Sequence, residues 1–135
     1  MLHRNRKSIQ AICLALSKRL FCRGHKHTWS DEHFYILDEG EITFLVGDEI
    51  KVGKKSDFIF VPRNTRHAFR VEREAVFLNG YTPAGLELAI IEMAMPAPTR
   101  TIPPKGATSP PNMSSEQYRR YGMDNLPGLN PQAPT

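Results

Sequence analysis

Apolar and polar residues alternate in short runs through the middle of the chain. Runs rich in aromatic and β-branched side chains recur at 34–37, 42–46, 49–52, 58–61, 67–71 and 75–78. Turn-forming residues separate them, among them Gly47-Asp48 and the stretch 53–56. Short strands joined by tight turns at such intervals are typical of a sandwich or barrel. The pattern therefore predicts that residues 24–82 form an all-β domain.

Aromatic residues are frequent within this predicted barrel. Most are expected in its core: Trp29, Phe34, Phe44, Phe58, Phe60 and Phe69. An apolar lining of this kind also suits an aromatic substrate, and the sequence alone does not separate the two roles.

The first 23 residues differ in composition from the rest. They carry basic but no acidic side chains and include the apolar stretch 9–16. Ile9, Ile12, Leu16 and Leu20 fall near one face of a helix, so a helix is the first expectation here. An amphipathic, acid-free leader resembles a mitochondrial presequence. The alternatives are a poorly packed extension or an artefact of the gene's start, with a cytoplasmic location as the default.

The C-terminal part is predicted to contain two short helices and an irregular strap. Leu86, Ala89, Ile90 and Met93 have the i, i+3, i+4, i+7 spacing of a helix with one apolar face, and Pro96 ends it. Ten of the 11 prolines lie at or after position 83, so 96–112 is expected to be extended. The stretch 114–117 reads as a capping box that opens a second helix, which Gly122 ends. The chain thus divides into an N-terminal segment (1–23), a barrel with its following helix (24–95) and a C-terminal strap and helix (96–135).

The formal net charge of +4 comes from the N-terminal segment. Residues 1–30 contain seven basic residues and no acidic one, whereas the remainder has 11 basic and 14 acidic residues. A general nucleic-acid-binding face is therefore not expected. Cys13 and Cys22 do not form a metal-type pair and are expected to be reduced. No apolar run is long enough to span a membrane.

Four residues combine into a candidate metal site: His25, His27, Glu32 and His67. Positions 25 and 27 project from one side of a strand, and Glu32 can join them if the chain bends or bulges. Three imidazoles and a carboxylate suit a divalent transition metal such as Fe, Mn, Ni, Co, Cu or Zn, and an octahedral ion keeps positions open for substrate. His33 lies out of phase with Glu32 and should face away.

These motifs resemble those of the cupin family. The first cupin motif appears as His25-x-His27, four residues, Glu32, and seven further residues to Gly40. The second runs from Gly53 to the stretch 62–67, which ends in His67. Within cupins, the strings 34–37, 60–70, 83–85 and 101–124 look like the small single-domain proteins grouped with quercetin 2,3-dioxygenase. The resemblance covers roughly 24–128 and implies an RmlC-like jelly-roll β-barrel with short C-terminal helices.

Three features depart from the family pattern. Asn64 stands where a Gly is usual, although Asn tolerates the left-handed conformation. The interval from Glu32 to Gly40 is one residue longer than common, which suggests a bulge or longer turn at Asp38-Glu39. Residues 1–23 do not look like the opening strands of the barrel. If those strands are missing, an exposed sheet edge results, which a second chain could complete as a homodimer.

The resemblance implies a metal-dependent oxidoreductase. His25, His27 and His67 would hold the ion, while Glu32 would be a ligand or the catalytic base. The expected partners are a small aromatic or enolic substrate and O₂, with quercetin 2,3-dioxygenase-like cleavage of a flavonol as the reaction. The alternatives are a non-catalytic module that binds a small molecule or metal, a truncated cupin without activity, and a metal-dependent isomerase. A sugar-phosphate isomerase would need inward-pointing Arg or Lys, which the positions of Arg63, Arg66 and Arg70 do not support.

Overall fold

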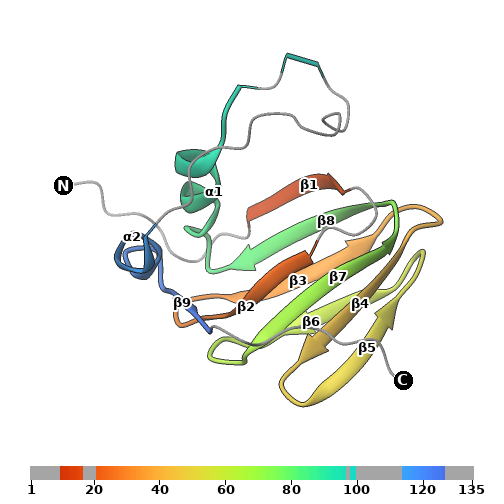
Figure 1. Cartoon of the computed structure of the whole chain (residues 1–135), viewed down its shortest axis with the longest axis horizontal. Coiled ribbons are helices and arrows are strands. Elements are labelled where there is room, and N and C mark those ends of the chain that lie inside the picture. Colours follow the sequence, from red (N-terminus) through yellow and green to blue (C-terminus); the bar gives the residue numbers. More distant parts are fainter. Residues whose placement is uncertain (1–9, 17–20, 97, 100–113, 127–135) are drawn as a thin grey trace.

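Two antiparallel sheets face each other in the computed structural model, which describes residues 10–16, 21–96, 98–99 and 114–126 (Figure 1). The strands are β1 (Gln10–Leu16), β2 (Phe21–His27), β3 (Asp31–Ile36), β4 (Glu41–Val46), β5 (Glu49–Gly53), β6 (Phe58–Val61), β7 (His67–Arg73), β8 (Ala75–Thr82) and β9 (Met123–Asn125). One sheet has the order β1-β8-β3-β6 and the other β5-β4-β7-β2-β9. The non-consecutive neighbours are those of a jelly roll, so the predicted all-β fold is confirmed.

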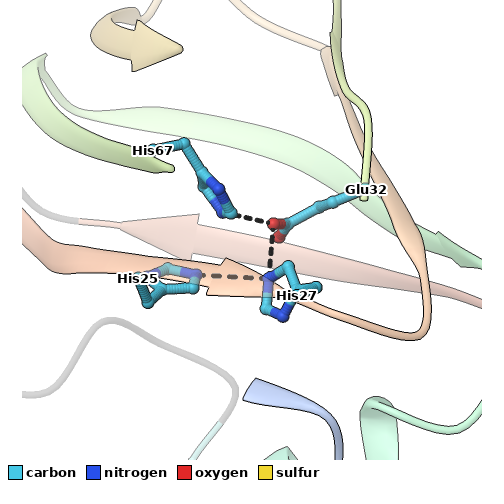
Figure 2. A group of neighbouring side chains, drawn as sticks. All are labelled: His25, His27, Glu32 and His67. Carbon is cyan, nitrogen blue, oxygen red and sulfur yellow. Dashed lines mark hydrogen bonds and ion pairs between the residues drawn. The ribbon is translucent and has the colours of Figure 1, made fainter. Parts of the chain in front are cut away.

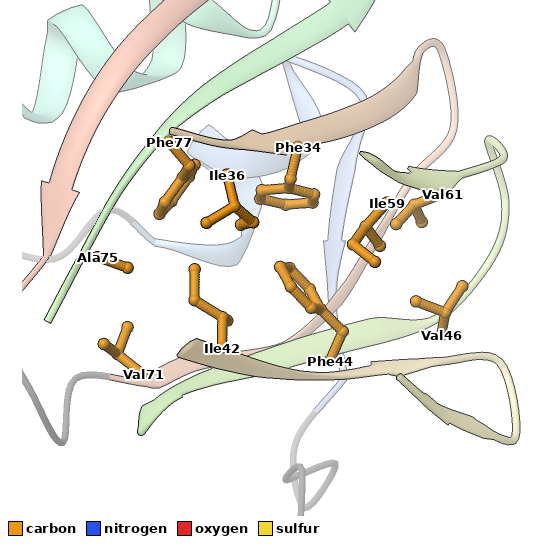
Figure 3. Packing of buried hydrophobic residues seen from close by; sticks show 10 residues of the cluster. All are labelled: Phe34, Ile36, Ile42, Phe44, Val46, Ile59, Val61, Val71, Ala75 and Phe77. Atoms are coloured by element: carbon orange, nitrogen blue, oxygen red, sulfur yellow. The ribbon is translucent and has the colours of Figure 1, made fainter. Parts of the chain in front are cut away.

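The hydrophobic core fills the space between the two sheets (Figure 3). Because side chains alternate along a strand, β3 turns Phe34 and Ile36 inward, and β4 turns Ile42 and Phe44 toward them. Full burial of each such side chain contributes about 1.5–3 kcal/mol of favourable transfer free energy. The core therefore depends on the period-two pattern that the sequence shows.

Three of the aromatic residues expected in the core are instead largely exposed. Trp29 is 48% exposed, Phe58 59% and Phe60 46%. In β6 it is Ile59 and Val61 that point inward, so the two phenylalanines lie on the outer face. Both faces of this strand are apolar, so the alternation alone does not tell which one is buried. Phe34 and Phe44 are buried as expected, and Phe69 is partly buried.

The predicted N-terminal helix is wrong for residues 10–16. These residues form β1, which pairs with β8 from the Gln10–Tyr81 pair to the Leu16–Ala75 pair. The first part of β2 also falls within the segment that was expected to lack opening strands. A seven-residue strand gains a full ladder against β8, whereas an isolated short helix is marginal. Residues 1–9 and 17–20 of the proposed leader lie outside the described residues.

Both C-terminal helices are present where the sequence predicts them. The first is α1 (Glu87–Met93) and the second α2 (Ser115–Arg119). The capping box of α2 is complete, with Gln117 N donating to Ser114 Oγ at 3.2 Å and Ser114 N to Gln117 Oε1 at 2.8 Å. Most of the predicted strap 96–112 lies outside the described residues. Within the described part of the chain, neither helix is long and apolar enough to cross a membrane.

The sequence gives no sign of β9, which joins the edge of β2. His25 pairs with Asn125 and His27 with Met123 in this ladder. Gly122 O, just before β9, accepts hydrogen bonds from Thr28 N at 2.7 Å and from Thr28 Oγ1 at 3.1 Å. The C-terminal segment thus returns to hold the strand that carries the His-x-His motif.

A second apolar cluster lies beside the barrel. Its buried members are Tyr81, Leu86 and Ala89, and Ile90, Tyr121 and Met123 pack against them. The cluster connects β8 to α1 and to the C-terminal segment. It fixes the position of the Tyr81 ring, which belongs to the interior of the barrel.

Candidate metal centre

The four predicted site residues meet inside the barrel. His25 and His27 come from β2, Glu32 from β3 and His67 from the first position of β7, and their side chains point toward one another (Figure 2). All four are buried, and one possible ligand atom from each lies within 4.8 Å of the others. The sequence prediction is therefore correct about which residues converge.

Local irregularities of β2 bring the first pair into place. The β2–β7 ladder shifts register between Cys22 and His25, and His25 then lies directly opposite His67. Such a bulge re-aims side chains, although it lies before the His-x-His pair and not between His27 and Glu32, where the sequence analysis placed a bend or bulge. The rings of His25 and His67 are 4.2 Å apart between centroids, so the two motifs meet at one point.

The turn that precedes His67 is hydrogen-bonded to the segment that carries the first cupin-like motif. Asn64 has φ +63°, the left-handed conformation expected at this position, and its backbone N donates to His27 O at 2.6 Å. The side chain of Asp31 accepts from Arg63 N at 2.8 Å and from the Arg63 guanidinium at 3.1 Å. The turn therefore fixes where β7 begins and where His67 enters the barrel.

Hydrogen bonds to backbone carbonyls orient two of the imidazoles. His25 Nδ1 lies 2.7 Å from Arg23 O, and His67 Nδ1 lies 2.9 Å from Thr65 O. A carbonyl only accepts, so each Nδ1 must carry the proton, and each Nε2 faces the centre as a potential metal donor. Metal-binding imidazoles are commonly fixed in this way. The donor set thus fits a divalent transition metal.

Glu32 stands at the middle of the cluster. Its Oε2 lies 2.8 Å from His27 Nε2 and 2.8 Å from His67 Nε2. His25 Nε2 is 3.2 Å from His27 Nε2, and His27 Nδ1 has no hydrogen-bond partner among the described residues. Two imidazole nitrogens thus face one carboxylate oxygen and a third faces His27, and the lone pairs of these atoms repel one another unless protons or a cation lie between them.

Burial and the neighbouring charges determine which of the four groups are protonated. Burial, followed by the neighbouring His67 and His27, lowers the pKa of His25 to about 3, so its ring is neutral. Burial opposes the ionisation of Glu32, but hydrogen bonds from His27 and His67 hold its pKa well below the usual value. Burial disfavours the charged form of His67, yet its bond to the Glu32 carboxylate raises the pKa of His67 above the ordinary value. A bound metal would take the place of the proton on His67.

Metal binding is therefore expected to weaken in mild acid. Because the pKa of His67 is raised, protons compete for its Nε2 already above about pH 6.5, and one displaced proton lowers the apparent affinity about tenfold per pH unit below that pKa. Competition with a chromophoric chelator between about pH 5.5 and 8.5 measures this. An affinity that stays constant down to about pH 6 would contradict the protonated His67–Glu32 pair.

The sequence analysis missed two polar residues of β8 that adjoin the site. The predicted strand ended at Leu78, but β8 continues to Thr82 and turns Asn79 and Tyr81 inward. Tyr81 is the cross-strand neighbour of Glu32, and Asn79 Nδ2 donates to Glu32 Oε1 at 2.9 Å. The alternation of Ala75, Phe77, Asn79 and Tyr81 was the signal that could have found them.

Two other candidate donors lie apart from the centre. His33 faces the outer side of the sheet as predicted, where its ring stacks on Phe58 with centroids 5.5 Å apart. Cys22 Sγ is 3.6 Å from His25 Nδ1, on the side of the ring away from the centre. Burial raises the pKa of the Cys22 thiol to about 12, and its place beside Nδ1 keeps the sulfur apart from the four groups that face the centre.

Comparison with known proteins places this barrel in a class. Residues 22–81 match the family model of the cupin domain, and no curated protein matches the sequence. Among solved structures, KdgF from Halomonas sp. is 16% identical with a TM-score of 0.56, and the match covers 61% of this chain and 76% of that one. An RmlC-like cupin from Shewanella frigidimarina NCIMB 400 is 23% identical with a TM-score of 0.55, over 61% and 72% of the two chains.

The lyase DddQ, which acts on DMSP, from Ruegeria pomeroyi DSS-3 is also similar. It is 27% identical with a TM-score of 0.51, and the match covers 56% of this chain but only 39% of the lyase. Fold and motifs thus define a small jelly-roll β-barrel with a buried group of possible metal ligands. Residues 22–81 match the cupin domain, and the fold is that of RmlC-like cupins.

Proposed function

We propose that the protein is a metal-dependent oxidoreductase that cleaves a flavonol-like or related enolic substrate with O₂. The observation that carries the proposal is the buried cluster of three imidazoles around the ionised carboxylate of Glu32. His25, His27 and His67 would hold the ion together with Glu32. When bound, such an ion would supply Lewis-acid activation of a deprotonated substrate oxygen.

The surroundings of the cluster support a substrate without phosphate groups. Among the described residues, the arginines near the second motif are paired with carboxylates at the surface. Arg63 binds Asp31, Arg66 binds Asp48, and Arg70 binds Glu72 at 2.6 Å. A phosphate-handling site needs cations that point inward, so a substrate without phosphate groups, such as an aromatic or enolic compound, is favoured.

Glu32 has a second role to fill in this proposal. The carboxylate is ionised and can accept the proton of a substrate hydroxyl, but, against the effect of burial, its hydrogen bonds lower its pKa, so it would be a weak base until a metal replaces the imidazole protons. Because Glu32 and the imidazoles around it are buried, a proton that Glu32 accepts would remain within the site. Both roles, metal ligand and base, would fall to Oε2, because Oε1 is held by Asn79.

An assay that follows substrate and O₂ together tests the proposal. Protein loaded in turn with Fe(II), Mn(II), Co(II), Ni(II), Cu(II) or Zn(II) is mixed with quercetin, and flavonol absorbance and O₂ consumption are recorded. We expect equimolar loss of both with at least one metal. Metal binding without turnover would contradict the proposal in favour of a binding module. Substrate loss without O₂ uptake would contradict it in favour of eliminative chemistry, as the similarity to a DMSP lyase would suggest.

A further inference from the structure

A buried polar pair stands behind Glu32, on the side away from the imidazoles. Asn79 is only 2% exposed and Tyr81 3%, and both lie on the inward face of β8 among apolar residues. Asn79 Nδ2 donates to Glu32 Oε1 at 2.9 Å and to His33 O at 3.3 Å, and the Tyr81 hydroxyl donates to Asn79 Oδ1. A buried amide is unfavourable in an apolar strand unless its groups are hydrogen-bonded, and here both the nitrogen and the oxygen of Asn79 have partners.

The direction of these hydrogen bonds is fixed by His33 O. A backbone carbonyl only accepts, so the amide nitrogen of Asn79 must be the atom that faces both His33 O and Glu32. Asn79 Oδ1 then faces Tyr81, whose hydroxyl must donate. Tyr81 in turn is held by Leu86 and Ala89 of the second apolar cluster. Asn79 therefore has a defined orientation and always presents a donor to Glu32.

The two oxygens of Glu32 consequently have different partners. Oε1 is engaged by Asn79, whereas Oε2 faces His27 and His67. If Oε1 turned to the centre, the buried amide of Asn79 would lose its carboxylate acceptor, which is unfavourable, so Oε1 stays on Asn79. Glu32 can then offer a metal only one oxygen.

We propose that Asn79, oriented by Tyr81, is a positioning residue that restricts Glu32 to single-oxygen ligation and so reserves room for a substrate that chelates through two oxygens. This inference rests on the proposed metal-dependent function and names its substrate class. With three imidazoles and one carboxylate oxygen, an octahedral ion has two positions left. A carboxylate that binds through both oxygens would leave one. Hydroxy-ketones of the flavonol type present two adjacent oxygens, whereas simple alcohols or carboxamides present one.

The test compares a chelating probe with a single-donor probe on the Co(II)-loaded protein. Maltol offers a hydroxyl and a keto oxygen, and azide offers one nitrogen; both alter the visible Co(II) spectrum when they bind. In Asn79→Leu, Glu32 Oε1 loses the amide that holds it away from the centre, so the carboxylate can bind with both oxygens. We expect maltol binding to weaken about tenfold or more, azide binding to change by less than about threefold, and Co(II) affinity to be retained or increased.

Two further variants keep the test decisive. Tyr81→Phe removes one hydroxyl and leaves Asn79 held by His33 O, so we expect the same selectivity with a smaller loss of maltol binding. If Asn79→Leu fails to fold, Tyr81→Phe alone tests the role of Asn79. His33→Gln keeps the carbonyl of residue 33 and changes only an outward side chain, so both probes should bind as in the wild type.

The outcomes separate this inference from the proposed function. Unchanged maltol binding in Asn79→Leu, or an equal loss for maltol and azide, would overturn the role of Asn79 while leaving the oxygenase proposal standing. Selective loss of maltol in a protein that turns over no flavonol would support the role of Asn79 and overturn the oxygenase proposal.

Discussion

Replacement of His67 by Gln should abolish tight binding of divalent transition metals and, with it, any turnover. His67 Nε2 is 2.8 Å from Glu32 Oε2 and lies directly opposite His25, so its removal leaves two imidazoles on one strand. Loss of a supporting residue behind a metal ligand commonly costs 10–100-fold in affinity, and loss of a ligand should cost about 100-fold or more. Isothermal titration with Co(II) or Zn(II) measures the change.

His33→Gln provides the matched control for this experiment. His33 is next to Glu32 in the sequence, but its ring packs on the outer face against Phe58 and Gly80. Its replacement should leave metal affinity within about twofold, since the His33 ring packs on Phe58 and touches none of the four candidate ligands. Similar losses for both variants would mean that any imidazole in this region contributes equally, and the assignment of the centre would be wrong.

The largest effect on stability is expected from Phe34→Ala. The Phe34 ring is 1% exposed and lies between Phe44, Phe69 and Phe77, with ring centroids 4.9, 5.7 and 5.6 Å away. Truncation leaves a cavity that three rings border, at a cost of about 3–5 kcal/mol in the free energy of unfolding. That is a large part of the 5–15 kcal/mol typical of a whole domain. Urea titration followed by the fluorescence of Trp29, the only tryptophan, measures it.

Phe58→Ala is the control on the same sheet. Phe58 is paired with Tyr35 in the β3–β6 ladder but points outward. Because its ring is already mostly in water, its loss should cost about 1 kcal/mol or less. An equal cost for the two variants would show that the sheet buries its outer face, contrary to the exposure described above.

The sequence predicted the barrel and the convergence of the four candidate ligands. The alternation of large apolar residues identified the inward face of β3 and β4, and the spacing of His25, His27, Glu32 and His67 identified the centre. At Asn64 the tolerance of asparagine for positive φ was enough to predict the turn. The strand and turn signals lie within a few residues of the features that they predict, whereas the four candidate ligands were brought together by their resemblance to the two cupin motifs.

The errors arose where long-range pairing decides the structure. Residues 10–16 fit a helical spacing, but the free edge of β8 offers them a complete ladder, so they form β1. The three residues of β9 have no pattern of their own and become a strand because β2 has a free edge beside His25 and His27. Asn79 and Tyr81 were missed because their role depends on Glu32, 47 positions from Asn79 in the sequence.

Metal content after purification and dialysis is the most direct test of the metal centre. Protein exposed to one first-row divalent metal at a time, dialysed at neutral pH and measured by elemental analysis should retain one ion per chain. The same treatment of a variant with both His25 and His27 replaced by Ala should leave none. A wild-type protein that retains no ion from Mn through Zn would contradict the metal centre and every activity built on it.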